Sequence, residues 1–211
     1  MNVLILTNGE YGDYHFVHHG TTCYDYVICA DNGLKHAMHL NLIPDLIVGD
    51  FDSVDQELLK QYASKGTQIY RYPQAKDETD TEIALCKAIK LKADKIDIFG
   101  GLGTRFDHSL ANVHLLYKAL NSNVMARLIS SHNVVYLIKD HCKIEGEEGD
   151  LVSLLPFTES VTGIDTSGLA YPLKDAVFNL GQPYGISNYL THKEAFVTIK
   201  SGVLIVIHAI D

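Results

Sequence analysis

The residues best suited to chemistry stand in the stretch LIVGDFDSVD, at positions 46–55. An apolar run typical of a buried strand is followed directly by Asp50 and Asp52. Phe51 stands between them and is expected to point away from the pair and anchor the turn in the core. Two carboxylates roughly 5 Å apart repel each other by about 3 kcal/mol at an effective dielectric constant of about 20. The pair predicts either a bound cation or an exposed turn, in which Ser53 caps a helix that begins near Asp55.

Three other polar clusters follow apolar runs in the same way. They are ADNG at 30–33, KDETD at 76–80 and GGLGTRFDH at 100–108. The carboxyl ends of parallel strands meet at one edge of a sheet, where ligands bind. We therefore expect these clusters and the aspartate pair to form one site.

Together the clusters favour phosphoryl-transfer chemistry. Asp50, Asp52 and Asp80 provide the oxygen ligands that Mg²⁺ prefers beside a polyphosphate. A glycine-rich loop that opens a helix and contains Arg105 would expose backbone N–H groups and a guanidinium to phosphates. The spacing is neither that of a P-loop nor that of a dinucleotide fingerprint, so the phosphate cradle is of another kind.

Each cluster also has a purely structural explanation. Thr79 and Glu82 have the spacing of a capping box, and Asp80 at the first helical position suits the helix dipole. The sequence Asp31-Asn32-Gly33 is also that of a tight turn. Four such clusters at successive strand ends favour the functional interpretation.

The elements that must position these residues change character along the chain. Up to about residue 128, strand-like runs at 3–6, 26–30, 46–49, 68–72, 95–100 and 124–129 alternate with helical patterns, notably 79–91 and 106–120. Beyond about residue 130, short alternating runs stand at 134–139, 142–147, 151–157, 160–164, 195–202 and 203–210. We predict an α/β catalytic domain with a parallel sheet at 1–129 and an antiparallel β-sandwich at 130–211.

Composition excludes several classes of protein. The net charge is −9 and there is no dense Lys/Arg run, which argues against a nucleic-acid surface. No apolar run approaches the roughly 18 residues of a membrane span, and the first residues do not read as a signal peptide, so we expect a cytoplasmic protein without membrane contact. The 4 cysteines contain no C-x-x-C pair, which predicts reduced thiols. HFVHH at 15–19 is expected to be solvated rather than metal-binding.

The motifs resemble those of the thiamin pyrophosphokinase family. The similarity is carried by ADNGL, PDLIVGDFDS, DETDTEIAL, GGLGTRFDHSLANVHLL, TSGLAYPL, GQPYGISN and SGVLIVI, in the order in which the family has them. They span about residues 29–207. The chain differs from the family pattern at Asn32 and Thr104, where glycine is common.

The resemblance implies transfer of a diphosphate from ATP to the hydroxyl of thiamin, with AMP released. It implies a homodimer with active sites between subunits. Asp50, Asp52 and Asp80 are placed to hold Mg²⁺ for this reaction, and either Asp50 or Asp80 is the better candidate for accepting the hydroxyl proton. Arg105 joins these aspartates as a catalytic candidate. The expected ATP contacts are Asp31, Asn32, Thr79, Gly101, Gly103, Arg105, Asp107 and His108.

The β-sandwich half should bind thiamin. The family resemblance favours Ser187 and Asn188 as contacts, and Tyr189, Ser167 and Tyr171 add hydroxyls and aromatic faces for a cationic ring. The tyrosines are equally compatible with ordinary sandwich positions. Two other functions use the same residues: a Mg²⁺-dependent nucleotide or sugar-phosphate hydrolase, and a non-catalytic thiamin-binding module.

Overall fold

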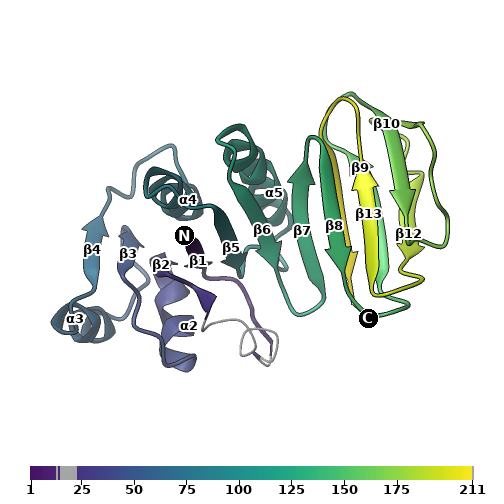
Figure 1. Cartoon of the computed structure of the whole chain (residues 1–211). Coiled ribbons are helices and arrows are strands. Elements are labelled where there is room, and N and C mark those ends of the chain that lie inside the picture. Colours follow the sequence, from purple (N-terminus) through teal and green to yellow (C-terminus); the bar gives the residue numbers. More distant parts are fainter. Residues whose placement is uncertain (13, 15–22, 211) are drawn as a thin grey trace. The chain divides into compact units, whose positions relative to one another are not determined.

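The computed structural model describes residues 1–12, 14 and 23–210, which fall into two compact units, Met1–Ser131 and His132–Asp211 (Figure 1). The HFVHH stretch at 15–19 lies outside the described residues. Within the described part of the chain, no helix is long and apolar enough to cross a membrane.

The first unit contains a parallel sheet of the order β6-β5-β1-β2-β3-β4. Its strands are β1 (Asn2–Leu6), β2 (Tyr26–Ala30), β3 (Leu46–Gly49), β4 (Gln68–Arg71), β5 (Lys95–Phe99) and β6 (Met125–Ile129). They match the strands expected from the apolar runs to within a residue or so. The predicted parallel α/β architecture of this half is confirmed.

Helices cover both faces of this sheet. They are the short 3-10 helix η2 (Asp31–Gly33), α2 (Leu34–His39), α3 (Gln56–Ser64), α4 (Asp80–Lys90) and α5 (Phe106–Asn121). Side chains alternate between the faces of a strand, and Val3, Leu4, Ile5 and Leu6 of β1 are all 0% exposed. Figure 1 shows α2 and α4 on opposite sides of β1 and β2. Burial on both faces explains why the strands are continuous apolar runs.

One charged group is buried in this sheet. The Asp97 side chain of β5 is 2% exposed and accepts hydrogen bonds from Nε and Nη2 of Arg127 at 2.7 and 2.8 Å. The Tyr24 hydroxyl donates to the same carboxylate at 2.7 Å, and Nζ of Lys95 lies 3.5 Å away. The carboxylate is thus paired from three sides, as a buried charge requires.

The second unit is built from two antiparallel sheets, of the orders β12-β9-β14-β7 and β11-β10-β13-β8. The strands are β7 (Asn133–Ile138), β8 (His141–Glu145), β9 (Leu151–Pro156), β10 (Ser160–Ser167), β11 (Ala176–Asn179), β12 (Gly185–Tyr189), β13 (Glu194–Thr198) and β14 (Leu204–Ala209). Buried residues of both sheets, such as Leu154 and Val206 of one and Val161 and Val197 of the other, share one core. The predicted antiparallel sandwich is confirmed, although β11 and β12 were not expected as strands.

Replacing Asp97 with alanine should lower the free energy of unfolding by about 3–5 kcal/mol, because the Arg127 guanidinium loses its buried partner. Urea denaturation followed by circular dichroism measures this change. As a control, Glu57→Ala removes an exposed ion pair with Lys60 and should cost about 1 kcal/mol or less. Equal effects of the two substitutions would contradict the assigned role of Asp97.

His36 of α2 should make stability depend on pH. Its side chain is buried, its Nδ1 lies 2.7 Å from the Tyr14 hydroxyl, and its ring stacks on Tyr11 with 3.6 Å between centroids. Burial, followed by the charge of Lys35, lowers its pKa from 6.5 to about 4. Between these two pH values His36 is therefore protonated in the unfolded chain but neutral in the folded chain. The free energy of unfolding is highest above pH 6.5 and decreases as the pH falls toward 4.

The expected loss is on the order of 3 kcal/mol at full effect. Urea titrations at a series of pH values should show a steeper decline for the wild type than for His36→Phe, which keeps an aromatic ring but cannot titrate. Parallel pH curves for the two proteins would contradict this assignment.

Candidate active site

A cavity of about 610 Å³ lies in the first unit, at the carboxyl ends of its strands. Its lining residues follow five of these strands: Thr7–Glu10 after β1, Asp31 after β2, Asp50 after β3, Gln74, Lys76 and Glu78–Asp80 after β4, and Gly100, Gly101 and Gly103–Arg105 after β5. These segments include all four polar clusters that the sequence singled out. The expectation that the clusters share one site is met in this unit.

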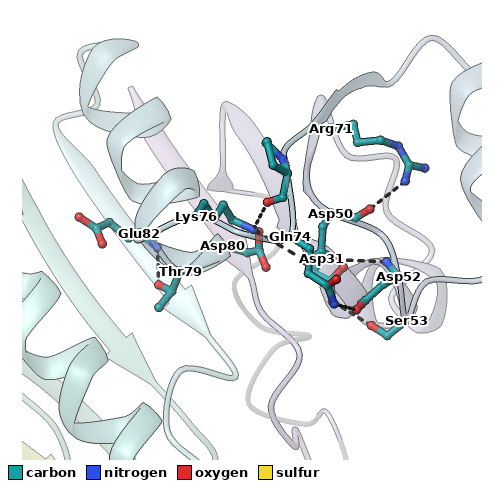
Figure 2. A network of polar contacts seen from close by, with 11 residues as sticks. Asp31, Asp50, Asp52, Ser53, Arg71, Gln74, Lys76, Thr79, Asp80 and Glu82 are labelled. Atoms are coloured by element: carbon teal, nitrogen blue, oxygen red, sulfur yellow. Dashed lines mark hydrogen bonds and ion pairs between the residues drawn. The ribbon is translucent and has the colours of Figure 1, made fainter.

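Three carboxylates gather at this site, and two of them, Asp31 and Asp50, line the cavity (Figure 2). Ligand oxygens of Asp31, Asp50 and Asp52 all lie within 4.8 Å of one another. Hydrogen bonds fix them: the Asp52 N–H donates to Asp50 at 3.1 Å, Ser53 Oγ to Asp31 at 3.0 Å and Gln74 Nε2 to Asp52 at 2.9 Å. The carboxylates are therefore oriented toward one another in spite of their mutual repulsion.

The turn that carries Asp50 and Asp52 is held by its central residue. Phe51 is 1% exposed in the core and has φ +62°, a left-handed conformation that is uncommon for an aromatic residue. The Arg71 guanidinium lies over its ring, 5.0 Å from the centroid, while Nη1 of Arg71 donates to the Asp50 carbonyl at 2.8 Å. The expectation that Phe51 anchors the turn in the core is confirmed.

The structural explanation of this turn is wrong in one respect. Asp55, not Ser53, caps α3, because its carboxylate accepts hydrogen bonds from the N–H groups of Glu57 and Leu58. The Ser53 hydroxyl is bonded to Asp31 instead. A capping role therefore does not account for the serine that follows the two aspartates.

Asp80 stands apart from the three clustered carboxylates and is linked to them by Lys76. Its Oδ1 lies 3.2 Å from Nζ of Lys76, and the same Nζ lies 3.9 Å from Oδ2 of Asp50. Burial raises the pKa of the Asp80 carboxyl, Lys76 acts in the opposite direction, and the charges of Asp31 and Asp50 raise it further. Asp80 therefore holds a proton more readily than an ordinary aspartate.

The site has the features of a divalent cation site. Oδ1 of Asp31 is buried and has no hydrogen-bond partner among the described residues, and the clustered donors are carboxylate oxygens, as Mg²⁺ prefers. Asp50 and Asp52 were expected as ligands; Asp31 was expected as an ATP contact and proves to be their third neighbour. Its position at the end of the adjacent strand was the available signal for this role.

Thr79 both caps α4 and lines the cavity. Its hydroxyl accepts a hydrogen bond from the Glu82 N–H at 3.1 Å, as the capping-box spacing predicts. The Glu82 carboxylate pairs with Lys118 at 2.5 Å. Asp80 is the first residue of the helix and also lines the cavity. The structural role of this segment at the start of α4 and its place at the site therefore do not exclude each other.

The glycine-rich loop also lines the cavity. Ser109 Oγ accepts a hydrogen bond from the Gly103 N–H at 3.0 Å, and Asn112 donates to the Gly101 carbonyl at 2.7 Å. One of the backbone donors expected for phosphates is thus already engaged by Ser109. Ser109 and Asn112 were not expected at this site from the sequence; they lie about one and two helical turns into α5 and line the cavity.

Arg105 and His108 line the cavity as expected, and Asp107 reaches the site through Arg105. The guanidinium donates to Asp107 at 2.6 Å through Nη2, and this bond lowers the pKa of the Asp107 carboxyl. The Arg105 side chain is 70% exposed and therefore free to turn toward a ligand. Of the expected ATP contacts, Asn32 lies in η2 and is not among the cavity-lining residues.

The loop after β1 was not singled out in the sequence. Thr7, Asn8, Gly9 and Glu10 all line the cavity. Gly9 packs so closely on the loop after β5 that a Cβ there would lie 2.0 Å from the Gly100 carbonyl oxygen. The TNGE stretch follows a strand, as the other clusters do, and this position was the signal for it.

The predicted thiamin residues lie in the second unit. The buried Asn188 side chain accepts hydrogen bonds from the N–H groups of Tyr171 and Tyr189, both at 3.0 Å, and donates to the Tyr171 carbonyl at 2.8 Å. Its amide is therefore used to hold the segment around Tyr171. The Tyr171 and Tyr189 rings are 66% and 40% exposed and meet edge to face, with 6.1 Å between centroids.

The two predicted serines lie in strands of different sheets. Ser187 has φ +56°, and its N–H donates to Ser153 Oγ at 3.1 Å, at the irregularity between Gly185 and Asn188 where β12 pairs with β9. Ser167 is exposed at the end of β10. Ser187 and the tyrosine pair thus offer polar and aromatic groups to solvent.

Comparison with known proteins gives a consistent result. Residues 17–128 match the family model "Thiamin pyrophosphokinase, catalytic domain", and residues 141–204 match "Thiamin pyrophosphokinase, vitamin B1 binding domain". Thiamine pyrophosphokinase of Bacillus subtilis is 33% identical over 186 residues, which is 87% of each chain.

Solved structures agree over the whole chain. A crystal structure of thiamine pyrophosphokinase from Bacillus subtilis has a TM-score of 0.89 at 30% identity and covers 100% of both chains. That of the Geobacillus thermodenitrificans protein has a TM-score of 0.86 at 27% identity and covers 100% of this chain and 98% of the other. With family models matched in both units, this chain belongs to the thiamin pyrophosphokinase family.

Proposed function

We propose that the chain transfers a diphosphate group from ATP to the hydroxyl of thiamin, giving thiamin diphosphate and AMP. The observation that carries the proposal is the carboxylate cluster of Asp31, Asp50 and Asp52, two of which line a cavity that is also lined by a glycine-rich loop with Arg105. Carboxylates and cationic groups facing one space suit a reaction in which a charged phosphoryl group is held by a metal ion. Membership of the family supplies the substrates.

In this proposal Mg²⁺ is held by Asp50 and Asp52, with Asp31 as a further ligand and Asp80 beside them. The ion, when bound, offsets charge on the transferred group. Hydrogen bonds from Ser53 and Gln74 keep the carboxylates in place, so the protein need not reorganise them during the reaction.

Asp80 is the better candidate for accepting the proton of the thiamin hydroxyl. Its pKa is raised, mainly by burial, and a general base is more effective as its pKa approaches the working pH. Asp50 is more directly committed to the cluster, since its Oδ1 accepts the Asp52 N–H. Of the two residues that the sequence left open for this role, Asp80 is therefore favoured over Asp50.

The nucleotide would be positioned by the glycine-rich loop, by the start of α5 and by the start of α4. Arg105 and His108 line the cavity and can reach phosphate oxygens, and Thr79 offers a hydroxyl there. The other proposed ATP contacts are Asp31, Asn32, Gly101, Gly103 and Asp107. Asp107 would act by orienting Arg105.

Thiamin would be bound by the second unit, where the vitamin B1 binding domain model matches. The exposed faces of Tyr171 and Tyr189 suit a cationic thiazolium ring, while Ser187 and Ser167 offer hydroxyls. Asn188 is assigned to holding the Tyr171 segment, because its amide atoms are bonded there. A homodimer in the cytoplasm is part of this proposal through the family resemblance.

The reaction itself is tested by phosphorus NMR of ATP and Mg²⁺ with and without thiamin. Wild type should produce AMP and thiamin diphosphate only when thiamin is present. Asp50→Asn should lower the rate by about 100-fold or more, since it removes charge that holds the metal. Glu57→Gln, an exposed charge change on α3, serves as the control and should leave the rate unchanged.

Two other outcomes would overturn this proposal. AMP or ADP formed without thiamin would identify a hydrolase. Tight thiamin binding without turnover would identify a binding module and make the aspartates structural.

The thiamin surface is tested separately by isothermal titration calorimetry. Tyr171→Ala should weaken thiamin binding about 2- to 30-fold, which corresponds to a cation–π contribution of roughly 0.5–2 kcal/mol. Tyr184→Ala removes another exposed tyrosine of the same unit and should have no effect. Equal affinities of wild type and Tyr171→Ala would place thiamin elsewhere.

A further inference from the structure

The carboxylate site contains a cation supplied by the chain itself. Lys76 follows β4, and its side chain is only 11% exposed. Its ammonium group lies 3.2 Å from Oδ1 of Asp80 and 3.9 Å from Oδ2 of Asp50, and it donates to the Pro73 carbonyl at 3.3 Å. The positive charge of Lys76 therefore lies within ion-pair distance of two carboxylates, while its hydrogen bond goes to the backbone.

The segment that carries Lys76 is folded onto the carboxylates. The Lys76 N–H donates to the Gln74 carbonyl at 3.1 Å, which makes a tight turn, and the Gln74 side chain donates to Asp52. Figure 2 shows Gln74 and Lys76 both directed at the acidic side chains. Two polar side chains from one loop thus occupy oxygens that face the site.

These contacts conflict with those of a bound metal ion. Oδ1 of Asp50 accepts the Asp52 N–H, and Oδ2 faces Lys76, so a metal ion bound to Asp50 must share or take over one of these oxygens. An ammonium and a divalent cation repel each other when both are close to one carboxylate. Occupation by the metal ion therefore disfavours the present position of Lys76.

We propose that Lys76 is the resident counterion of this site and competes with the divalent cation for Asp50 and Asp80. The inference rests on the proposed function only in taking that cation to be Mg²⁺. Lys76 also lines the cavity, so an ammonium displaced from the carboxylates enters the space that a polyphosphate would occupy. The metal ion then binds weakly alone and more tightly together with a nucleotide, because the polyphosphate gives Lys76 a new partner.

The test measures binding of Mn²⁺ alone, which has the same preference for oxygen ligands, from the loss of the free-ion signal in electron paramagnetic resonance. Lys76→Gln should bind Mn²⁺ about fivefold or more tightly than wild type, a change within the usual range of coupling between sites. Lys76→Arg, which keeps the charge, should remain close to wild type. Lys90→Gln has the same charge change at an exposed position at the end of α4 and is the matched control.

A second titration includes the α,β-methylene analogue of ATP, in which a carbon bridge that cannot be cleaved replaces the oxygen between the α- and β-phosphorus atoms. The analogue should increase Mn²⁺ affinity more in wild type than in Lys76→Gln. Lys76→Met, which keeps the aliphatic part of the side chain, should agree with Lys76→Gln, and thermal melting confirms that each variant is folded.

Unchanged or weaker Mn²⁺ binding by both Lys76→Gln and Lys76→Met would overturn the inference, as would an equal gain in Lys90→Gln. The titrations contain no thiamin and involve no turnover, so their result is independent of the assay for AMP. Failure of diphosphate transfer with tighter Mn²⁺ binding in the variants would overturn the proposed function alone.

Discussion

Repulsion between like charges is the constraint around which the first unit is arranged. Asp31, Asp50 and Asp52 place oxygens within 4.8 Å of one another, and each such pair costs about 3 kcal/mol at an effective dielectric constant of about 20. The neighbouring groups all oppose this cost. Ser53, Gln74 and the Asp52 N–H donate hydrogen bonds to the carboxylates, and Lys76 adds a positive charge. The site is stable only because several separate segments meet there.

The hydrophobic core of this unit also helps to offset the energetic cost of the site geometry. A left-handed backbone conformation at a non-glycine residue costs of order 1–3 kcal/mol, and Phe51 adopts one in the turn between the two aspartates. Burial of a phenylalanine side chain contributes a stabilisation of similar size, about 1.5–3 kcal/mol. The ring lies in the core and beneath Arg71, so the strained turn is fixed by packing rather than by the aspartates themselves. Core stability and site geometry are therefore coupled at one residue.

Much of this arrangement could be predicted from the sequence because strand periodicity and strand-end composition are local signals. The continuous apolar runs gave the parallel strands, and Asp50, Asp80 and Arg105 stand where those strands end. The place of Asp31 beside Asp50 could not be predicted in the same way, since it depends on the pairing of β2 with β3, in which Ala30 is opposite Val48.

Other features depend on where a side chain points. Lys76 lies in a sequence that is equally compatible with a solvated loop, and its contacts with the carboxylates follow from the turn at Gln74. Asn188 is of a residue type that often contacts ligands, but its side-chain amide is hydrogen-bonded to the backbone of Tyr171. The strand β12 begins with glycine and contains Ser187-Asn188, so it lacks the apolar alternation by which strands are found.

The close approach of Gly9 to Gly100 has a consequence for how this cavity can change over evolution. Both residues line the cavity, and the two backbones are too near for any side chain at Gly9. This part of the wall is therefore made of peptide groups, whose shape and polarity do not vary with side-chain substitution. Lineages that acquire a different nucleotide preference would have to do so through residues on the other walls, while this corner stays the same in all of them.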